Sequence, residues 1–443
     1  MTRLLLAAGA ALLLGAALRA ANPPVEELRA LAADTAADMV GVNTHLYYYD
    51  RIYGSGWERI VRPRLLELGA RHIRDGLNPA DSAYHAKLKD LARSGVRALL
   101  VHWDPKNAGV ERSRDTVRAL NADASHPVEA VEPPNEHDNA GEGWEARLSG
   151  TMSSMWRAYR GDPATRSMAI VGPSFANTRD SAARMAAAAP DAWRWMDLGN
   201  VHGYSGGNPV EGPLGGGWGI SLDDALARYR RLSRAKPLMA TEAGFHNAVS
   251  GGVPGHFGVT ERAASKYMPR LFLTYLRKGV RRVYLYELVD EGSDPRDMEQ
   301  NFGLVRLDGA PKEQFHAVRA FIRLLADPGP AFHPGSLRLR LDGADGVEVT
   351  LLQKRDGSFH LALWQPVASY DPRRRADVEP PERTVTLTLD RPAGGFRVFR
   401  PSTHGVAPVA ASGAGPTLRV TVPDHVVLVE IRPAGGGGHR VER

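Results

Sequence analysis

The sequence predicts a (β/α)8 TIM barrel of the α/β class, followed by a C-terminal antiparallel β-sandwich. Up to residue 326, short runs rich in apolar residues alternate with longer segments of helical spacing. Such alternation requires a parallel sheet, and eight units favour a closed barrel over an open doubly wound sheet. Beyond residue 330, short segments alternate apolar and polar residues between Gly, Pro and Asp turns, which is typical of an antiparallel sandwich.

Composition and charge narrow the classes of function. The 443 residues are 43% hydrophobic and 24% charged, which excludes a disordered chain and provides for a large buried core. The net charge of +6 comes from scattered basic residues without a dense run, so nucleic-acid binding is not expected. Because cysteine is absent, disulfides, thiolate metal sites and thiol catalysis are excluded. Any catalysis must therefore use side chains with oxygen or nitrogen groups.

The first residues have the pattern of a signal peptide over residues 1–21. A positive start at Arg3 precedes the 15 apolar residues Leu4–Leu18, too few for a comfortable membrane span. We therefore expect a secreted protein, periplasmic or extracellular. The small residue Ala20 favours cleavage, and an uncleaved signal anchor is the alternative because bulky residues precede it. No other contact with a membrane is expected.

Residues 22–326 are assigned to the barrel. After a Pro-Pro linker and a helix expected over Val25–Ala37, eight candidate strands follow: Met39–His45, His72–Asn78, Val96–Trp103, Val128–Glu136, Met168–Ser174, Leu198–Tyr204, Pro237–Phe245 and Arg282–Asp290. Helical spacing predicts helices such as Trp57–Leu68, Ala83–Ser94, Arg147–Arg160, Leu222–Ala235, Thr260–Lys278 and Lys312–Ala326. Gly69, Gly95 and Gly279 each follow a helix and precede a strand, as left-handed C-terminal caps do. No G-x-G-x-x-G motif follows the first strand, which disfavours a dinucleotide site.

Residues 331–433 are assigned to the β-sandwich. The proline-stiffened segment at residues 327–330 is too short to act as a hinge. Seven candidate strands follow: Leu337–Leu341, Val347–Gln353, His360–Gln365, Thr384–Leu389, Phe396–Arg400, Thr417–Val422 and Val426–Arg432. Aromatic residues here are few and scattered, so we expect this domain to support the barrel rather than to bind sugar itself. Residues 434–443, rich in glycine, are expected to be a disordered tail.

Reactive side chains converge at the ends of three predicted strands. Active sites in such barrels are built at the C-terminal ends of the strands. The fourth strand ends in Asn135 and Glu136, the sixth in His202 and Tyr204, and the seventh in Glu242. Two carboxylates thus meet at one rim, from strands three places apart around the ring. Opposed carboxylates are what glycosidic-bond cleavage requires, one as acid and one to attack or stabilise the anomeric carbon.

This pattern resembles the retaining (β/α)8 glycoside hydrolases of the large clan A, most closely the family 39-like and family 5-like enzymes. Their mark is Asn-Glu at the end of strand four and Glu at the end of strand seven, and family 39-like enzymes carry a trailing β-domain. The resemblance implies that Glu136 is the general acid/base, Glu242 the nucleophile and Asn135 a partner of the sugar 2-hydroxyl. Tyr204 resembles the tyrosine that donates to the nucleophile, and His202 the histidine beside it. Retention predicts carboxyl groups about 5 to 5.5 Å apart.

Other residues at strand ends are expected to bind or position the sugar. Arg74 on strand two resembles the clan's arginine beneath the nucleophile, which its positive charge would keep ionised. His45 after strand one, and His102 and Trp103 after strand three, are candidate sugar ligands, because pyranose faces stack on aromatic rings. Strand eight departs from the clan, where many members place Trp under the cleaved sugar. Glu287 there is expected to replace a stacking contact with a hydrogen bond.

Several of these residues also have structural interpretations. Arg74 alternatively forms a buried ion pair with a neighbour such as Asp75, and His45 and His102 alternatively are core histidines with satisfied hydrogen bonds. Glu132 within strand four is expected to be structural. Loop aromatics above the rim offer further sugar platforms or cover the barrel mouth: Tyr47–Tyr49, Trp57, Trp144 and Trp218.

The sequence thus predicts a secreted retaining glycoside hydrolase acting on a β-linked glycan, monomeric and without metal or organic cofactor. A non-catalytic glycan-binding protein on the same scaffold is one alternative, because fold alone does not imply turnover. A metal-dependent hydrolase is the other, with ligands offered by His102, Asp104, His126, His137, Asp138 and His202. Neither a His-x-His on strand one nor a His-Glu-x-x-His helix is present, which disfavours that class.

Overall fold

The computed structural model describes residues 25–102, 109–215 and 219–434. In this part of the chain, eight parallel strands form one sheet in the order β7-β6-β5-β4-β3-β12-β9-β8, and a parallel bridge between Val171 and Leu198 joins its two edges into a closed barrel. The predicted barrel is confirmed. Seven of the predicted strands each contain one observed strand, and the eighth, Arg282–Asp290, overlaps an observed strand that begins two residues earlier. Their bounds are β3 (Val40–Asn43), β4 (His72–Gly76), β5 (Arg97–Val101), β6 (Val128–Glu132), β7 (Ala169–Ile170), β8 (Gly199–His202), β9 (Leu238–Ala243) and β12 (Val280–Leu285).

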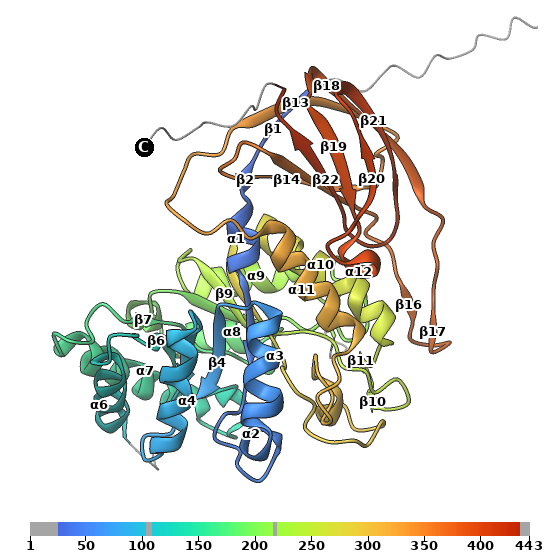
Figure 1. Cartoon of the computed structure of the whole chain (residues 1–443). Coiled ribbons are helices and arrows are strands. Elements are labelled where there is room, and N and C mark those ends of the chain that lie inside the picture. Colours follow the sequence, from blue (N-terminus) through green and yellow to red (C-terminus); the bar gives the residue numbers. More distant parts are fainter. Residues whose placement is uncertain (1–24, 103–108, 216–218, 435–443) are drawn as a thin grey trace, which may run out of the picture.

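Helices follow the barrel strands and pack outside them (Figure 1). The larger ones are α3 (Arg62–Leu68), α4 (Ser82–Arg93), α6 (Val110–Asn121), α7 (Trp144–Gly161), α8 (Ser181–Ala188), α9 (Leu222–Leu232), α10 (Glu261–Arg277) and α11 (Glu313–Leu325). Gly69, Gly95 and Gly279 have φ of 82°, 86° and 74°, the left-handed geometry expected of C-terminal caps. Shorter elements lie in the loops: α2 (Ile52–Ser55), the π-helical η1 (Trp57–Val61), η2 (His137–Asn139), η3 (Ala192–Trp195), β10 (Gly252–Val253), β11 (His256–Phe257) and η4 (Glu299–Asn301).

The prediction of a helix over Val25–Ala37 is wrong for most of that segment. Residues there form β1 (Glu26–Arg29) and β2 (Leu31–Ala32), and only then α1 (Ala33–Asp38). β1 pairs antiparallel with β13 (Ser336–Asp342), and β2 pairs parallel with β14 (Glu348–Gln353), so both strands belong to the C-terminal domain although the sequence places the start of the barrel at residue 22. Ala, Leu and Glu favour helix by local propensity, and pairing with distant strands overrides that weak preference.

The C-terminal domain is the predicted sandwich of two mainly antiparallel sheets. Among the described residues, one sheet has four strands in the order β1-β13-β18-β21 and the other six in the order β2-β14-β15-β22-β19-β20. Each of the predicted strands is found, and the strand β20 and the hairpin β16–β17 are additional. Remaining bounds are β15 (Phe359–Trp364), β16 (Tyr370–Asp371), β17 (Ala376–Asp377), β18 (Arg383–Ala393), β19 (Gly395–Phe399), the short helix α12 (Pro401–His404), β20 (Pro408–Ser412), β21 (Gly415–Val422) and β22 (Val427–Arg432).

An apolar cluster continues from the barrel domain into the C-terminal domain, which also has a hydrophobic core of its own. In Figure 1 the sandwich lies over α10 and α11 of the barrel, and the buried side chains Leu352, Trp364 and Leu428 of its six-stranded sheet belong to the same apolar cluster as buried side chains of these two helices. Buried charges cross the boundary as well, since Lys266 on α10 donates to Asp424 Oδ2 at 3.0 Å. The sandwich is therefore packed on the barrel as an integral part of the molecule.

Several sequence predictions fall on residues that the structure leaves undescribed. They include the signal peptide over residues 1–21, Trp103, Asp104, Trp218 and nearly all of the glycine-rich tail. Among the described residues, no helix has both the length and the apolar character needed to cross a membrane.

Candidate active site

A cavity of about 610 Å³ opens at the C-terminal ends of the barrel strands. This volume lies within the range of roughly 300 to 1,000 Å³ typical of small-molecule sites. Residues that end or follow most of the barrel strands form its wall. Of the predicted site residues that the structure describes, those in the wall are His45, Arg74, His102, Asn135, Glu136, Tyr204 and Glu242.

Two donors hold the carboxylate of Glu242 at the end of β9. Arg74 Nη1 donates to its Oε1 at 2.7 Å, and the Tyr204 hydroxyl donates to its Oε2 at 2.7 Å. Burial alone would raise the pKa of Glu242, but the positive charges of His202 and Arg74 and the hydrogen bond from Tyr204 outweigh it, so the pKa lies below its ordinary value. Glu242 is thus an ionised carboxylate fixed at the cavity wall, as a nucleophile must be.

Arg74 organises the floor of the cavity. Its Nε and Nη2 donate to the two oxygens of Glu132 at 3.0 and 2.9 Å, a bidentate pairing that a lysine cannot make. Its Nη1 also donates to Asn43 Oδ1 at 3.0 Å, and its Nη2 to Asn135 Oδ1 at 2.7 Å. With the bond to Glu242, all the N–H donors of the guanidinium are used. Arg74 therefore fixes the Glu242 carboxylate and the Asn135 amide together.

The sheet register explains why these distant residues meet. Asn43 on β3 lies directly opposite Arg74 on β4, and His202 on β8 lies directly opposite Glu242 on β9. Neighbouring residues in register place their side chains on the same face of a sheet, here the barrel interior. The polar groups thus lie side by side inside the barrel, at the C-terminal ends of its strands.

Glu136 follows β6 in a constrained backbone conformation. Its φ of 42° and ψ of 46° lie in the left-handed region, which costs a non-glycine residue about 1–3 kcal/mol. Its backbone N–H donates to Ser174 Oγ at 3.2 Å, which helps to hold this conformation. Its side chain is 24% exposed and contacts His202 Nδ1 at 2.7 Å through Oε1. The strained turn thus directs the carboxyl of Glu136 into the cavity.

The hydrogen-bond donors around His202 indicate that Glu136 and His202 share a proton. The Thr241 hydroxyl donates to Asn200 Oδ1 at 2.9 Å, so its oxygen accepts from His202 Nε2 at 3.0 Å. With Nε2 protonated, the contact between Nδ1 and Glu136 needs one further proton on either side. Burial lowers the pKa of His202, and the nearby carboxylates of Glu242 and Glu136 raise it by more. A carboxyl in this position is suited to give and take a proton.

The two carboxylates face the same point of the cavity. One oxygen of Glu136, one oxygen of Glu242 and a ring nitrogen of His202 all lie within 4.8 Å of one another. Asn135 lies beside them, with its Oδ1 bonded by Arg74 and, at 3.3 Å, by Ser174 Oγ. Because the oxygen of the Asn135 amide is committed to the protein, its N–H₂ is the group that can donate to a ligand.

The remaining predicted ligands differ in their environment. His102 lines the cavity, but its Nε2 lies 2.9 Å from the hydroxyl of Tyr159, and burial lowers its pKa to about 3, so it is neutral. Glu287 is completely buried, and its carboxylate faces His45 Nε2 at 3.1 Å. The expected hydrogen bond from Glu287 to a sugar is therefore wrong, because its side chain lies outside the cavity wall.

Of the predicted loop aromatics that the structure describes, some line the cavity and others are exposed or pack in the core. Tyr47 and Tyr48 line the cavity, whereas Tyr49 is 45% exposed and lies over the ammonium group of Lys87. Trp57 packs against the apolar core. Trp144 is buried against Phe175 and is not a platform for sugar.

Several of the side chains that line the cavity were not predicted from the sequence, and four of them are polar or aromatic groups in the loops after β9 and β12. They are His256 in the β10–β11 hairpin, Tyr286 after β12, and Glu299 and Phe302 in the following loop. Tyr286 had a usable signal, since it lies at the end of strand eight, where the clan places its stacking aromatic. Burial and the charge of Glu242 raise the pKa of Glu299 to about 7. Residues like these lie in long loops, whose shape no periodic pattern reveals.

Solved structures with the same architecture are glycoside hydrolases. A family 39 glycoside hydrolase from the gut symbiont Bacteroides cellulosilyticus WH2 aligns over 91% of this chain and 82% of its own, with a TM-score of 0.58 at 14% identity. A glucosidase from Croceicoccus marinus aligns over 86% of this chain and 94% of its own, with a TM-score of 0.57 at 12% identity. No family model and no curated protein matches the chain. The chain therefore has the fold of these hydrolases, a (β/α)8 barrel with a trailing β-sandwich.

Proposed function

We propose that this chain is an exported retaining glycoside hydrolase that cleaves a β-linked glycan by double displacement. The observation that carries the proposal is the placement of the Glu136 and Glu242 carboxylates, which have oxygens within 4.8 Å of each other and of His202 at one point of the cavity. Such close approach supports direct attack on the sugar. Inverting enzymes separate their carboxyl groups by about 6.5–9.5 Å to hold a water molecule between one carboxylate and the sugar.

In the first step, Glu136 donates its proton to the glycosidic oxygen while a Glu242 oxygen attacks the anomeric carbon. The glycosidic bond breaks, the leaving group departs as an alcohol, and the sugar becomes an ester of Glu242. In the second step, Glu136 accepts a proton from water, and the water oxygen displaces Glu242 from the same carbon. Two inversions return the original configuration, and Glu136 is protonated again.

The surroundings of each carboxylate support this division of roles. Arg74 and Tyr204 donate to Glu242, which favours the ionised form that attacks. Glu136 Oε1 lies 2.7 Å from His202 Nδ1, a hydrogen-bonding partner that suits an acid that must become a base in the second step. The Asn135 amide lies where it can donate to a hydroxyl next to the reacting carbon. A protein that only binds glycan would need neither a proton donor nor an ionised nucleophile, so this arrangement favours an enzyme over the non-catalytic alternative.

Export is part of the proposal and is supported by the sequence alone. Arg3 and the apolar residues Leu4–Leu18 have the pattern of a secretory signal. We further propose that the protein acts as a monomer. The sugar and the linkage are the properties that a screen on a panel of β-linked oligosaccharides and polysaccharides would establish, because they depend on the loops around the cavity.

The experiment that tests the role of Glu136 is Glu136→Ala with azide rescue. On aryl glycosides with good leaving groups, the first step needs little acid, so the variant should accumulate the ester and turn over slowly. Added azide can replace water without a base and should raise the rate by roughly 10-fold or more and yield glycosyl azide. Rates and products are measured by absorbance and by mass spectrometry.

The same assays on the wild-type chain and on a variant of the exposed Glu58, Glu58→Gln, provide the controls. Azide should leave both unchanged. If Glu136→Ala loses activated and unactivated substrates equally and azide has no effect, Glu136 is not the acid/base and the proposed mechanism fails.

A further inference from the structure

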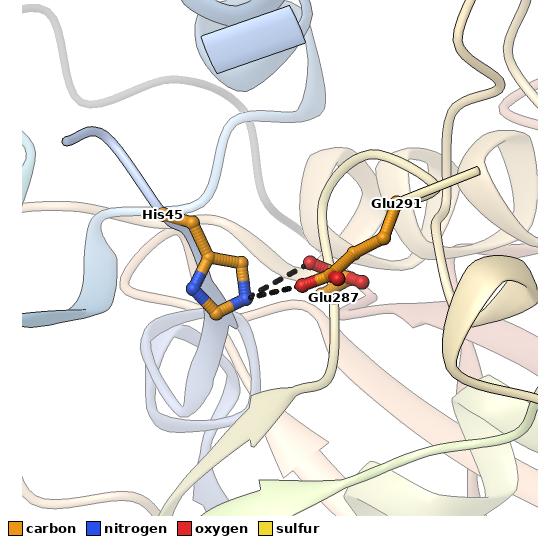
Figure 2. A group of neighbouring side chains, drawn as sticks. All are labelled: His45, Glu287 and Glu291. Carbon is orange, nitrogen blue, oxygen red and sulfur yellow. Dashed lines mark ion pairs between the residues drawn. The ribbon is translucent and has the colours of Figure 1, made fainter. Parts of the chain in front are cut away.

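A second cluster of ligating side chains lies beyond the ends of β3 and β12, where His45 lines the cavity and Glu287 is buried behind the wall. Figure 2 shows His45, Glu287 and Glu291, with both carboxylates directed toward the same ring nitrogen of His45. We propose that this cluster binds one divalent transition-metal ion of the zinc class through His45 Nε2, Glu287 Oε2 and Glu291 Oε1. The proposal is independent of the proposed catalytic mechanism, in which these residues take no part.

The spacing of the three atoms fits a tetrahedral ion. Zinc binds histidine nitrogen and carboxylate oxygen at about 2.0–2.2 Å, so two ligand atoms on a tetrahedron lie about 3.3 Å apart. His45 Nε2 lies 3.1 Å from Glu287 Oε2 and 3.5 Å from Glu291 Oε1. All three atoms lie within 4.8 Å of one another. One imidazole and two carboxylates supply three ligand atoms of the kinds that zinc binds, which leaves a fourth position for water.

Buried polar atoms without hydrogen-bond partners are a second, independent reason to place a metal ion at this cluster. Glu287 has no exposed surface, and neither of its carboxylate oxygens has a hydrogen-bond partner among the described residues. His45 Nε2 is also buried without such a partner, because its contact with Glu287, although short, lacks hydrogen-bond geometry. A buried carboxylate without donors is costly, and a metal ion satisfies both it and the nitrogen lone pair at once.

The cluster of Glu136, His202 and Glu242 provides a contrast. Glu136, His202 and Glu242 are equally close to one another, but each of their ligating atoms is already used. His202 Nδ1 is bonded to Glu136, and Glu242 accepts from Arg74 and Tyr204. A cation there would have to displace a guanidinium and a shared proton. The His45 cluster is therefore the site that the geometry favours for a metal.

Neighbouring residues hold the proposed ligands in place. The ring of His45 stacks on Tyr48 at 4.6 Å between centroids and meets the edges of Tyr53 and Tyr286 at 5.8 and 5.9 Å. Arg51 Nη1 donates to Glu291 Oε2 at 2.7 Å, which leaves Oε1 for the ion. An ion bound here would tie the loop after strand one to the loop after strand eight. Its role would be to fix this wall of the cavity.

The test is a titration of the full-length chain with Zn²⁺. After removal of metal with a chelator, calorimetry at pH 7.5 should show one equivalent bound with a Kd below about 1 μM. At a free Zn²⁺ concentration 100 times the Kd, Tm should rise by roughly 3 °C. His45→Asn and Glu291→Gln should each weaken binding by at least about 100-fold, because loss of a ligand exceeds the 10–100-fold cost of losing a supporting group.

Three controls make the result specific. Glu136→Gln should bind Zn²⁺ like the wild type, which separates this site from the catalytic cluster. His316→Asn, a change of an exposed histidine on α11, should also have no effect. Glu291 is 16% exposed, so its variant should retain the circular dichroism spectrum and Tm of the metal-free wild type. Absence of binding, binding unaffected by the two ligand variants, or binding lost with Glu136→Gln would each overturn the proposal and leave a protonated His45 paired with Glu287.

Discussion

Replacing Glu242 with glutamine should abolish turnover while the protein stays folded. The amide keeps the shape of the side chain but cannot form the glycosyl ester, so kcat should fall by roughly 10⁴-fold or more, a rise of about 5.4 kcal/mol in the barrier. The buried site should tolerate the change, because the Gln oxygen can still accept from Arg74 or Tyr204. Initial rates on the best substrate from the glycan panel, together with glycan binding by calorimetry, measure both properties.

The control for this variant is Glu58→Gln, an isosteric change at an exposed position, which should keep full activity. Activity of Glu242→Gln within a factor of about 10 of the wild type would show that Glu242 is not the nucleophile. Loss of binding along with loss of turnover would show that the residue is structural. Retained binding without turnover is the outcome that the mechanism requires.

Removal of the C-terminal domain should be the most damaging change to stability. A chain truncated after Ala326 loses the sheet that covers α10 and α11, strips the partners from β1 and β2, and leaves Lys266 without Asp424. Exposed core and an unpaired buried charge should give insoluble or unfolded protein. Solubility, circular dichroism and thermal melting measure the outcome. A truncated barrel that is soluble, fully active on small substrates and impaired only on polymers would show that the domain is a binding module.

A point variant tests the same interface in a full-length chain. Trp364 on β15 is completely buried in the apolar cluster that continues from the barrel into the C-terminal domain, and its Nε1 donates to Glu211 Oε1 at 2.7 Å. Trp364→Ala should lower the free energy of unfolding by about 3–5 kcal/mol, since it leaves a large cavity and removes a buried hydrogen bond. Val409→Ala, at a position 38% exposed in the same domain, should cost less than about 0.5 kcal/mol.

The architecture was predictable because its signals are local. Apolar runs bounded by turn residues located every barrel strand, and glycines such as Gly69 marked helix ends through a backbone angle that other residues avoid. Strands β1 and β2 were missed for the opposite reason. Their residues favour helix locally, and only pairing with the distant strands β13 and β14 of the C-terminal domain makes them extended.

The candidate site was predictable where strand ends determine it. Parallel strands bring their C-terminal ends together, so the spacing of Glu136, His202 and Glu242 in the sequence was enough to place them at one rim. The burial of Glu287 behind the cavity wall was not predictable from the sequence. Because of it, the Glu287 carboxylate faces His45 instead of a sugar. The wall residues in long loops, such as Phe302, depend on tertiary packing that no sequence spacing encodes.

The most direct test of the central claim is to trap the sugar on the protein. A 2-deoxy-2-fluoro glycoside with a good leaving group forms the ester but hydrolyses it slowly, because fluorine destabilises the charged transition states. Once the preferred sugar is known, mass spectrometry of the intact chain should show one fluorosugar added, and peptide mapping should place it on Glu242. Label on another residue would contradict the assignment of the nucleophile, and turnover with an inverted anomeric product and no label would contradict double displacement.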